Sequence, residues 1–151
     1  MQPVNQQTTL DARYRTIVIL WFALFTSIGL FFLLTILVSS TVAINENRIL
    51  SSSLLVVGTV TVLASYFIKK RLLAQSVSEQ NIGLVQTGVV VAGALTESAA
   101  LFGVLDYFAT GNPYYYLLMI IAVIGSLLNF PRRAHLEAAS YKSSQPKDLW
   151  K

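Results

Sequence analysis

The chain has 151 residues, of which 54% are hydrophobic and only 12% are charged, and its mean hydropathy is +0.61. This composition is too apolar for an ordinary water-soluble domain of that length, so it predicts an integral membrane protein. The sequence contains no cysteine, which excludes disulfides, thiolate metal sites and thiol nucleophiles. Any chemistry must therefore use the few polar groups placed in or beside the membrane.

Four apolar segments are long enough to cross a bilayer, because a helical span needs about 20 mainly apolar residues. They cover residues 14–38, 52–68, 82–108 and 113–130. We therefore expect an all-α fold, an integral membrane four-helix bundle over residues 14–130. A polar tail of residues 1–13 precedes this bundle, and a basic tail of residues 131–151 follows it.

The basic residues are distributed unevenly between the two sides of the expected bundle. Only Arg48 lies between the first and second spans, whereas the other basic residues flank the spans on the opposite side: Arg13, Arg15, Lys69, Lys70, Arg71, Arg132, Arg133, Lys142, Lys147 and Lys151. The positive-inside rule then predicts that both termini are cytoplasmic. We expect the membrane to be a bacterial inner membrane. The same distribution explains the net charge of +4 by topology and argues against nucleic acid as a partner.

The first span, residues 14–38, is rich in bulky Leu, Ile and Phe and is expected to face lipid. Its small residues Thr26, Ser27 and Gly29 could give a close helix contact, although isolated small residues in a span are more often only tolerated. The second span offers the hydroxyls of Thr59, Thr61 and Ser65, which could support a site or bond to their own backbone.

The polar segment Lys69 to Asn81 is predicted to be a short cytoplasmic turn. A short connection between two helices favours an antiparallel hairpin, so the second and third spans are expected to pack together.

The third span carries an acid, Glu97, near its middle. A charged residue at the centre of a membrane helix costs about 2.5 to 3.5 kcal/mol even on lenient scales, so Glu97 is by default a functional candidate. Two interpretations stay open: a reversible proton or cation site, or a carboxyl held neutral by burial or paired with another polar group. Gln86 shares its face of the helix, about three turns away.

The opposite face of the third span is a stripe of small residues that would let another helix approach closely. These candidate helix-packing residues are Gly88, Ala92, Thr96, Ala99 and Gly103.

Beyond Glu97, Asp106 is interpreted as a solvated helix end near the outer surface. Pro113 suits the first turn of the fourth span, which ends before Pro131. The only histidine, His135, follows the fourth span and is interpreted as a surface residue.

The run from Gly93 to Leu105, GALTESAALFGVL, resembles the carboxylate helix of the proteolipid c subunits of rotary ATP synthases. The family pattern is a small residue, Ala, Leu, any residue, Glu, Ala or Ser, and then an apolar stretch that ends in Gly-Leu-Val. The resemblance implies that Glu97 is the ion-carrying carboxylate and that Ser98 stands where sodium-using members supply a hydroxyl. It also implies a proteolipid-like hairpin formed by the second and third spans, flanked by two further transmembrane helices.

From these patterns we expect a small membrane subunit that handles a proton or cation, H⁺ or Na⁺, through Glu97. Its partners would be the bilayer and other membrane subunits, including further copies of the chain. The alternative is a non-catalytic accessory subunit in which Glu97 or the small-residue stripe holds a partner helix. A self-contained catalytic site, a metal site and a resident cofactor are not indicated by any motif, so enzyme activity stays undecided.

Overall fold

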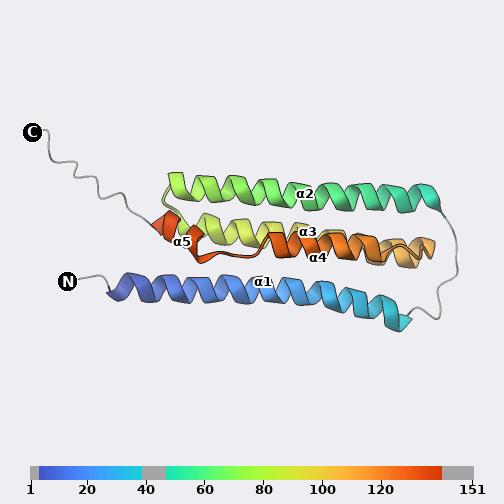
Figure 1. Cartoon of the computed structure of the whole chain (residues 1–151), viewed down its shortest axis with the longest axis horizontal. Helices are drawn as coiled ribbons and strands as arrows, with labels where there is room; N and C mark the ends of the chain where they lie inside the picture. Colours follow the sequence, from blue (N-terminus) through green and yellow to red (C-terminus); the bar gives the residue numbers. More distant parts are fainter. Residues whose placement is uncertain (1–3, 39–46, 141–151) are drawn as a thin grey trace, which may run out of the picture.

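The computed structural model describes residues 4–38 and 47–140, and every regular element in that part of the chain is a helix. Three helices are long: α1 spans Val4–Val38, α2 spans Arg48–Ser78 and α3 spans Ile82–Thr110. Two shorter helices follow, α4 at Tyr116–Leu128 and α5 at Arg133–Ser140. The long helices lie side by side in an elongated bundle with α3 between α1 and α2 (Figure 1). The expected all-α fold is confirmed.

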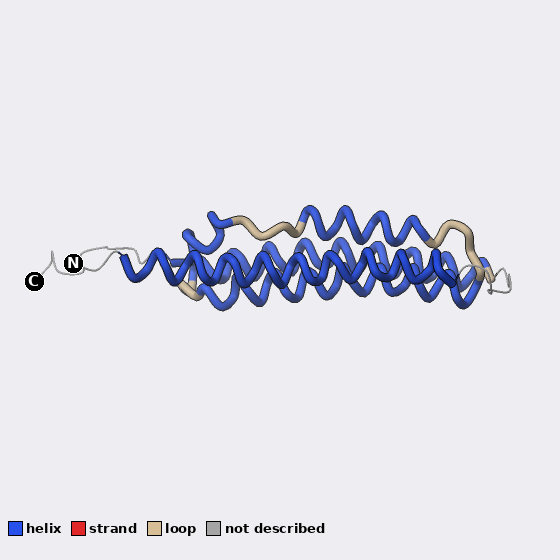
Figure 2. Tube along the Cα trace, turned by 90° about the horizontal axis from the view of Figure 1, so that it is seen from below, coloured by secondary structure: helices blue, strands red, loops and turns tan. Residues whose placement is uncertain are grey.

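The fourth expected span differs from the other three. α1 from Leu10, α2 and α3 are each long and apolar enough to cross a membrane, which indicates an integral membrane protein. α4 has only 13 residues, and at 1.5 Å per residue it is about 20 Å long, shorter than a hydrocarbon core of about 30 Å. It qualifies as a span only when combined with α5, to which it is bent by 44° (Figure 2).

The break between α4 and α5 has a local cause. Pro131 has no N–H to donate, and its ring disfavours the helical conformation at Phe130, so the helix cannot continue through this point. The side chain of Lys69, from α2, binds the carbonyls freed there. Its Nζ donates to the carbonyl oxygens of Asn129 at 2.7 Å and Phe130 at 3.3 Å. A cation at a helix C-terminus also interacts favourably with the helix dipole.

Two expected boundaries are wrong because helices continue further than the apolar segments do. Residues 4–13 were expected in a tail but form the first turns of α1, and residues 69–78 were expected in a turn but extend α2. Neither stretch contains glycine or proline, so nothing in them breaks a helix. The connection to α3 is therefore short. Gln80 adopts a positive φ of 51°, and the Asn81 side chain caps α3 by accepting from the Gly83 amide at 2.9 Å.

α4 starts later than expected. Residues 113–115 form a turn instead of the first turn of a helix. The Asn112 side chain accepts a hydrogen bond from the Tyr114 amide at 3.0 Å, a local bond that favours the turn over a helix. Most of the 131–151 tail lies beyond α5, and residues 141–151, with Lys142, Lys147 and Lys151, are outside the described residues.

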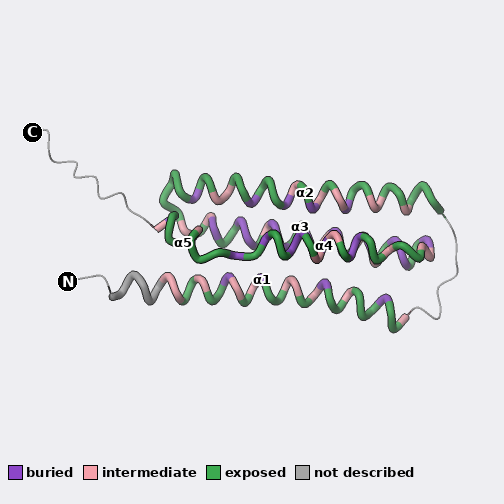
Figure 3. Tube along the Cα trace, viewed as in Figure 1, coloured by how far each residue is buried: buried purple, intermediate pink, exposed green. Residues whose placement is uncertain are grey.

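The buried side chains gather on α3, while α1 and α2 expose most of their surface (Figure 3). The structure buries every residue of the small-residue stripe: Gly88, Ala92, Thr96, Ala99 and Gly103. A Cβ placed on Gly88 would lie 3.3 Å from Leu72 Cβ of α2, and one on Gly103 would lie 3.2 Å from Leu118 Cβ of α4. The stripe is therefore used inside the chain, to bring α2 and α4 against α3.

Candidate functional site

Glu97 is half-buried on the side of α3 that faces α1. The hydroxyl of Ser27, on α1, donates a hydrogen bond to Glu97 Oε1. Gly93, one turn before Glu97, allows this approach, because a Cβ at Gly93 would lie 2.5 Å from Leu24 Cδ1. Leu24 and Ser27 are one turn apart on α1, as Gly93 and Glu97 are on α3. The two contacts therefore lie next to each other in the interface between α1 and α3.

The hydrogen bonds of Ser27 bear on the protonation of Glu97. Ser27 Oγ also lies 2.8 Å from the Leu24 carbonyl oxygen, within hydrogen-bonding distance. A hydroxyl has one hydrogen and can accept through its lone pairs. If Ser27 donates its hydrogen to the Leu24 carbonyl, Ser27 Oγ can only accept a hydrogen bond from Glu97. Glu97 can donate that bond only when its carboxyl is protonated. With a neutral Glu97, Ser27 can hydrogen-bond both Glu97 and the Leu24 carbonyl. With an ionised Glu97, the single Ser27 hydrogen can be donated to only one of them.

No described residue forms an ion pair with Glu97. The ion pairs within the described ranges join Arg133 to Asp11 and to Glu137, each at 2.9 Å and at one end of the bundle. Among the described side chains, the hydrogen-bond partner of Glu97 is the Ser27 hydroxyl. The site therefore pairs the acid with a hydroxyl and not with a basic group.

Ser98 and Gln86, the other candidates on this helix, do not contact Glu97 through their side chains. The Ser98 hydroxyl donates to the Ala94 carbonyl at 2.9 Å, which leaves its oxygen free to accept. Gln86 is exposed near the start of α3. With 1.5 Å of rise per residue, it is about 16 Å along the helix from Glu97, so it supports the site only if a further group lies between them.

The hydroxyls of α2 lie elsewhere. Thr59 and Thr61 each donate to a carbonyl of their own helix at 2.8 Å. Ser65 is buried and accepts hydrogen bonds from Thr96 of α3 at 3.4 Å and from Asn129 Nδ2 at 3.0 Å. Ser65 thus joins α2, α3 and the end of α4, on a different side of α3 from Glu97. None of the three hydroxyls supports the Glu97 site in this structure.

The sequence did not connect Ser27 with the Glu97 site. Of the two interpretations of Ser27, a tolerated small residue or a close helix contact, the hydrogen bond to Glu97 supports the helix contact. Its neighbours behave as expected: Thr26 is exposed, and a Cβ on Gly29 would meet nothing within 4 Å. The sequence contained one indication of this contact: Ser27 and Glu97 both lie near the middle of their apolar segments, so they are expected at a similar depth in the membrane.

A second polar cluster surrounds Asp106 at the other end of the bundle from α5. Asp106 was expected to be a solvated helix end, but it is only 2% exposed. Its Oδ2 accepts from Asn112 Nδ2 at 2.7 Å and from Ser51 Oγ at 3.1 Å, and its Oδ1 accepts from Thr110 Oγ1 at 2.9 Å. Both carboxylate oxygens are therefore occupied, and the cluster ties the start of α2 to the end of α3.

The described ranges, 4–38 and 47–140, contain no group of three or more His, Cys, Asp or Glu residues able to hold a metal ion. Comparisons with protein-family models, with curated proteins and with solved structures found no match to this chain.

Proposed function

We propose that the protein is a membrane subunit in which Glu97 takes up and releases a proton or a monovalent cation within the bilayer. Glu97 lies near the middle of α3, one of three helices long and apolar enough to cross a membrane, and this position supports a role within the bilayer. The likeness of residues 93–105 to the proteolipid c carboxylate helix favours the same role. In this proposal the chain acts in a larger membrane assembly, with other subunits or further copies of itself supplying the path to either side.

The observation that carries the proposal is the hydroxyl of Ser27 beside Glu97. When Glu97 is protonated, Ser27 accepts its hydrogen and donates its own to the Leu24 carbonyl. When Glu97 is ionised, Ser27 turns its single hydrogen toward the carboxylate. Ser27 can therefore bond either state of Glu97 without a movement of the helices, which is what a reversible proton carrier requires. For a cation, the oxygens of Ser27, Glu97 and Ser98 are the available ligands.

A structural role is the alternative, and the same contact favours it. A hydrogen bond between Ser27 and a permanently neutral Glu97 would hold α1 on α3, near the close approach at Gly93. Interhelical hydrogen bonds in membranes contribute about 0.6 to 2 kcal/mol. In this case Glu97 would stabilise the chain itself, and the small-residue stripe would not be available to a partner because it is buried.

Chemical labelling of Glu97 tests the proposal. A hydrophobic carbodiimide attacks protonated carboxyls in membranes, so we would measure by mass spectrometry the rate of its addition to Glu97 in lipid vesicles, over a range of pH. We expect the rate of labelling to decline as the pH rises. If Na⁺ is the ion that Glu97 binds, adding Na⁺ should also slow labelling. Asp106 is the internal comparator, because its oxygens are occupied by three side chains.

Two variants separate the proposed function from the structural alternative. Ser27→Ala should shift the pH range of labelling, whereas Thr26→Ala, at the exposed neighbouring position, should not. Glu97→Gln should remove labelling while the protein keeps its stability. A Glu97 that stays unlabelled at every pH in the folded protein, together with equal destabilisation by Ser27→Ala and Glu97→Leu, would overturn ion handling and establish the structural role.

A further inference from the structure

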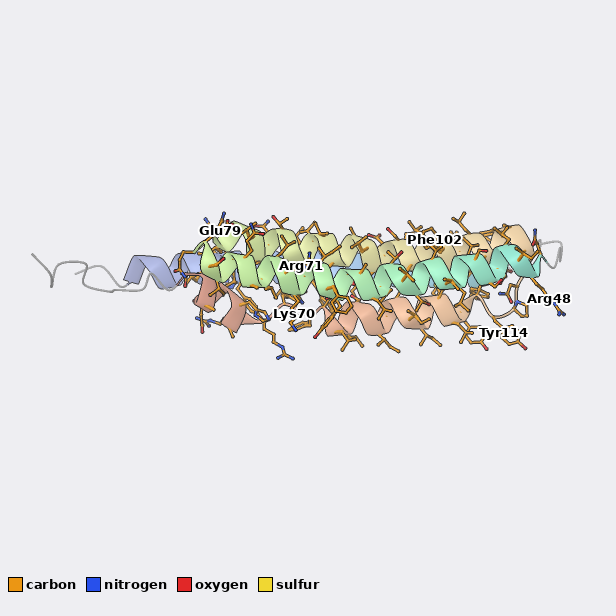
Figure 4. The ribbon with its side chains drawn as sticks, turned by 90° about the horizontal axis from the view of Figure 1, so that it is seen from above. Arg48, Lys70, Arg71, Glu79, Phe102 and Tyr114 are labelled. Atoms are coloured by element: carbon orange, nitrogen blue, oxygen red, sulfur yellow. The ribbon has the colours of Figure 1, made fainter. Side chains whose placement is uncertain are left out.

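A cavity of about 340 Å³ lies between α2 and the junction of α4 with α5. We call it the inner-end pocket. Four basic side chains line this pocket: Lys69, Lys70, Arg132 and His135. They lie toward the end of the bundle that contains α5. The rest of its wall includes the apolar side chains of Leu128 and Phe130. Lys70 and Arg71 lie at this end, opposite Arg48 and Tyr114 (Figure 4).

The positive charges of the inner-end pocket are only partly used within the chain. Lys69 is held by the carbonyls of Asn129 and Phe130 and is 6% exposed. Lys70 and Arg132 are exposed, and neither forms an ion pair with a described residue. Burial and the charges of Lys69 and Arg132 lower the pKa of His135 below its usual value. The pocket thus concentrates positive charge with no acid in its lining.

The apolar side of the pocket continues onto the surface that faces lipid. Leu128 is 67% exposed and Phe130 is 41% exposed. Exposed Leu127 and Phe67 extend this apolar surface along α4 and α2. A soluble anion would leave these side chains in contact with water or lipid alone, whereas a phospholipid would cover them with its acyl chain. Basic pockets between helices on the cytoplasmic side of a membrane commonly hold anionic headgroups.

We propose that the inner-end pocket binds an anionic membrane phospholipid, with its phosphate between Lys70 and Arg132 and its acyl chain along Leu128 and Phe130. This site is separate from Glu97 and does not rest on the ion-handling role. Bound lipid would bridge α2 and the α4–α5 junction. It would fix the bent part of the bundle against the long helices.

Lipid retention in matched variants tests this site. The full-length protein would be placed in nanodiscs of phosphatidylcholine with a minor fraction of phosphatidylglycerol, released gently, and examined by native mass spectrometry for bound lipid. The wild type should retain phosphatidylglycerol in preference to phosphatidylcholine. In K70Q/R132Q the preference should fall roughly 30-fold, since each of the two basic residues contributes about 1 kcal/mol near the surface and 1.4 kcal/mol corresponds to tenfold.

The control is R15Q/R71Q, which removes the same charge from the same end of the bundle, at exposed positions that lie outside the pocket lining and form no ion pair with a described residue. It should keep the preference. Equal losses in the two double variants would show only general surface attraction and would overturn the pocket. The proposal would also be overturned if the wild type showed no preference for phosphatidylglycerol. Displacement of phosphatidylglycerol by inorganic phosphate at equal concentration would overturn it as well. Lys70→Gln alone, at an exposed position, repeats the test if the double variant does not fold.

Discussion

Polar side chains within this bundle take the hydrogen bonds that their immediate surroundings allow. Thr59 and Thr61 each donate to a backbone carbonyl of their own helix. Asp106 has three neighbouring donors and stays buried with both oxygens occupied. Glu97 has a single hydroxyl beside it, and that hydroxyl can donate or accept. The surroundings of the two acids therefore differ: three described side chains donate to the carboxylate of Asp106, and one donates to that of Glu97.

Removal of Asp106 should destabilise the fold. Asp106→Ala removes the carboxylate that accepts from Ser51, Thr110 and Asn112. Thr110 keeps the backbone carbonyl of residue 106 and Asn112 keeps Ser51 Oγ, whereas Ser51 loses its described acceptor. A buried group left unpaired costs about 1 to 3 kcal/mol. We expect a loss of that size in the free energy of unfolding, measured by denaturant titration in mixed micelles. Glu79→Ala removes an exposed acid at the end of α2 and should have little effect. Equal losses in the two variants would contradict the structural role of the Asp106 cluster.

At the scale of the helices, glycines determine which pairs of elements pack closely. α4 approaches α2 and α3 at Gly125, where a Cβ would lie 2.5 Å from Val62 Cγ1 and 3.2 Å from Thr96 Cγ2. α1 approaches α3 at Gly93, where the nearest atom is the end of the Leu24 side chain. Both neighbouring groups at Gly125 belong to β-branched residues, which are stiff at χ1. Leu24 can move its terminal methyl more easily.

Single alanine substitutions at the glycines should therefore differ in a predictable order. Gly125→Ala forces Val62 or the whole of α4 outward, and overpacking of this kind costs about 1 to 3 kcal/mol. Gly93→Ala should cost less, and Gly29→Ala should cost nothing, because no atom lies within 4 Å of its Cβ. Thermal unfolding in the same detergent would rank the variants. A Gly29→Ala protein as unstable as Gly125→Ala would contradict the packing described for α4.

The end of α4 depends on a residue from α2. Lys69→Met removes the donor that binds the carbonyls of Asn129 and Phe130, and hydrogen bonds to charged groups contribute about 1.5 to 3 kcal/mol. We expect faster amide hydrogen exchange in residues 125–135, measured by mass spectrometry, with α1 unchanged. Arg71→Met, on the exposed part of the same helix, is the control. Unchanged exchange at the α4–α5 junction in Lys69→Met would show that Pro131 alone determines this end.

For the whole molecule, the arrangement of the helices gathers the described basic residues at one end. The start of α1, the end of α2 and α5 lie together at this end, and Arg48 lies at the other (Figures 1 and 4). The positive-inside rule then predicts that the end with α5 faces the cytoplasm. This orientation also places the inner-end pocket beside the cytoplasmic leaflet, where anionic lipids are attracted to basic residues.

Single introduced cysteines would test the orientation directly, because the natural chain has none. Ser78→Cys lies at the end with α5, and Tyr114→Cys lies at the opposite end; both positions are exposed. A membrane-impermeant maleimide added to intact cells should label Tyr114→Cys and should label Ser78→Cys only after the membranes are opened. Labelling of Ser78→Cys in intact cells would reverse the orientation.

The sequence by itself determined the helical class, three segments long and apolar enough to cross a membrane, the stripe of small residues on α3 and the acid at its centre. These follow from hydropathy and helical periodicity, which are local properties of the chain. Only the tertiary structure decided that Ser27 contacts Glu97, that Asp106 is buried and that Lys69 binds the end of α4. Each of these depends on which helix lies beside which and at what rotation, and a pattern within one helix does not contain that information.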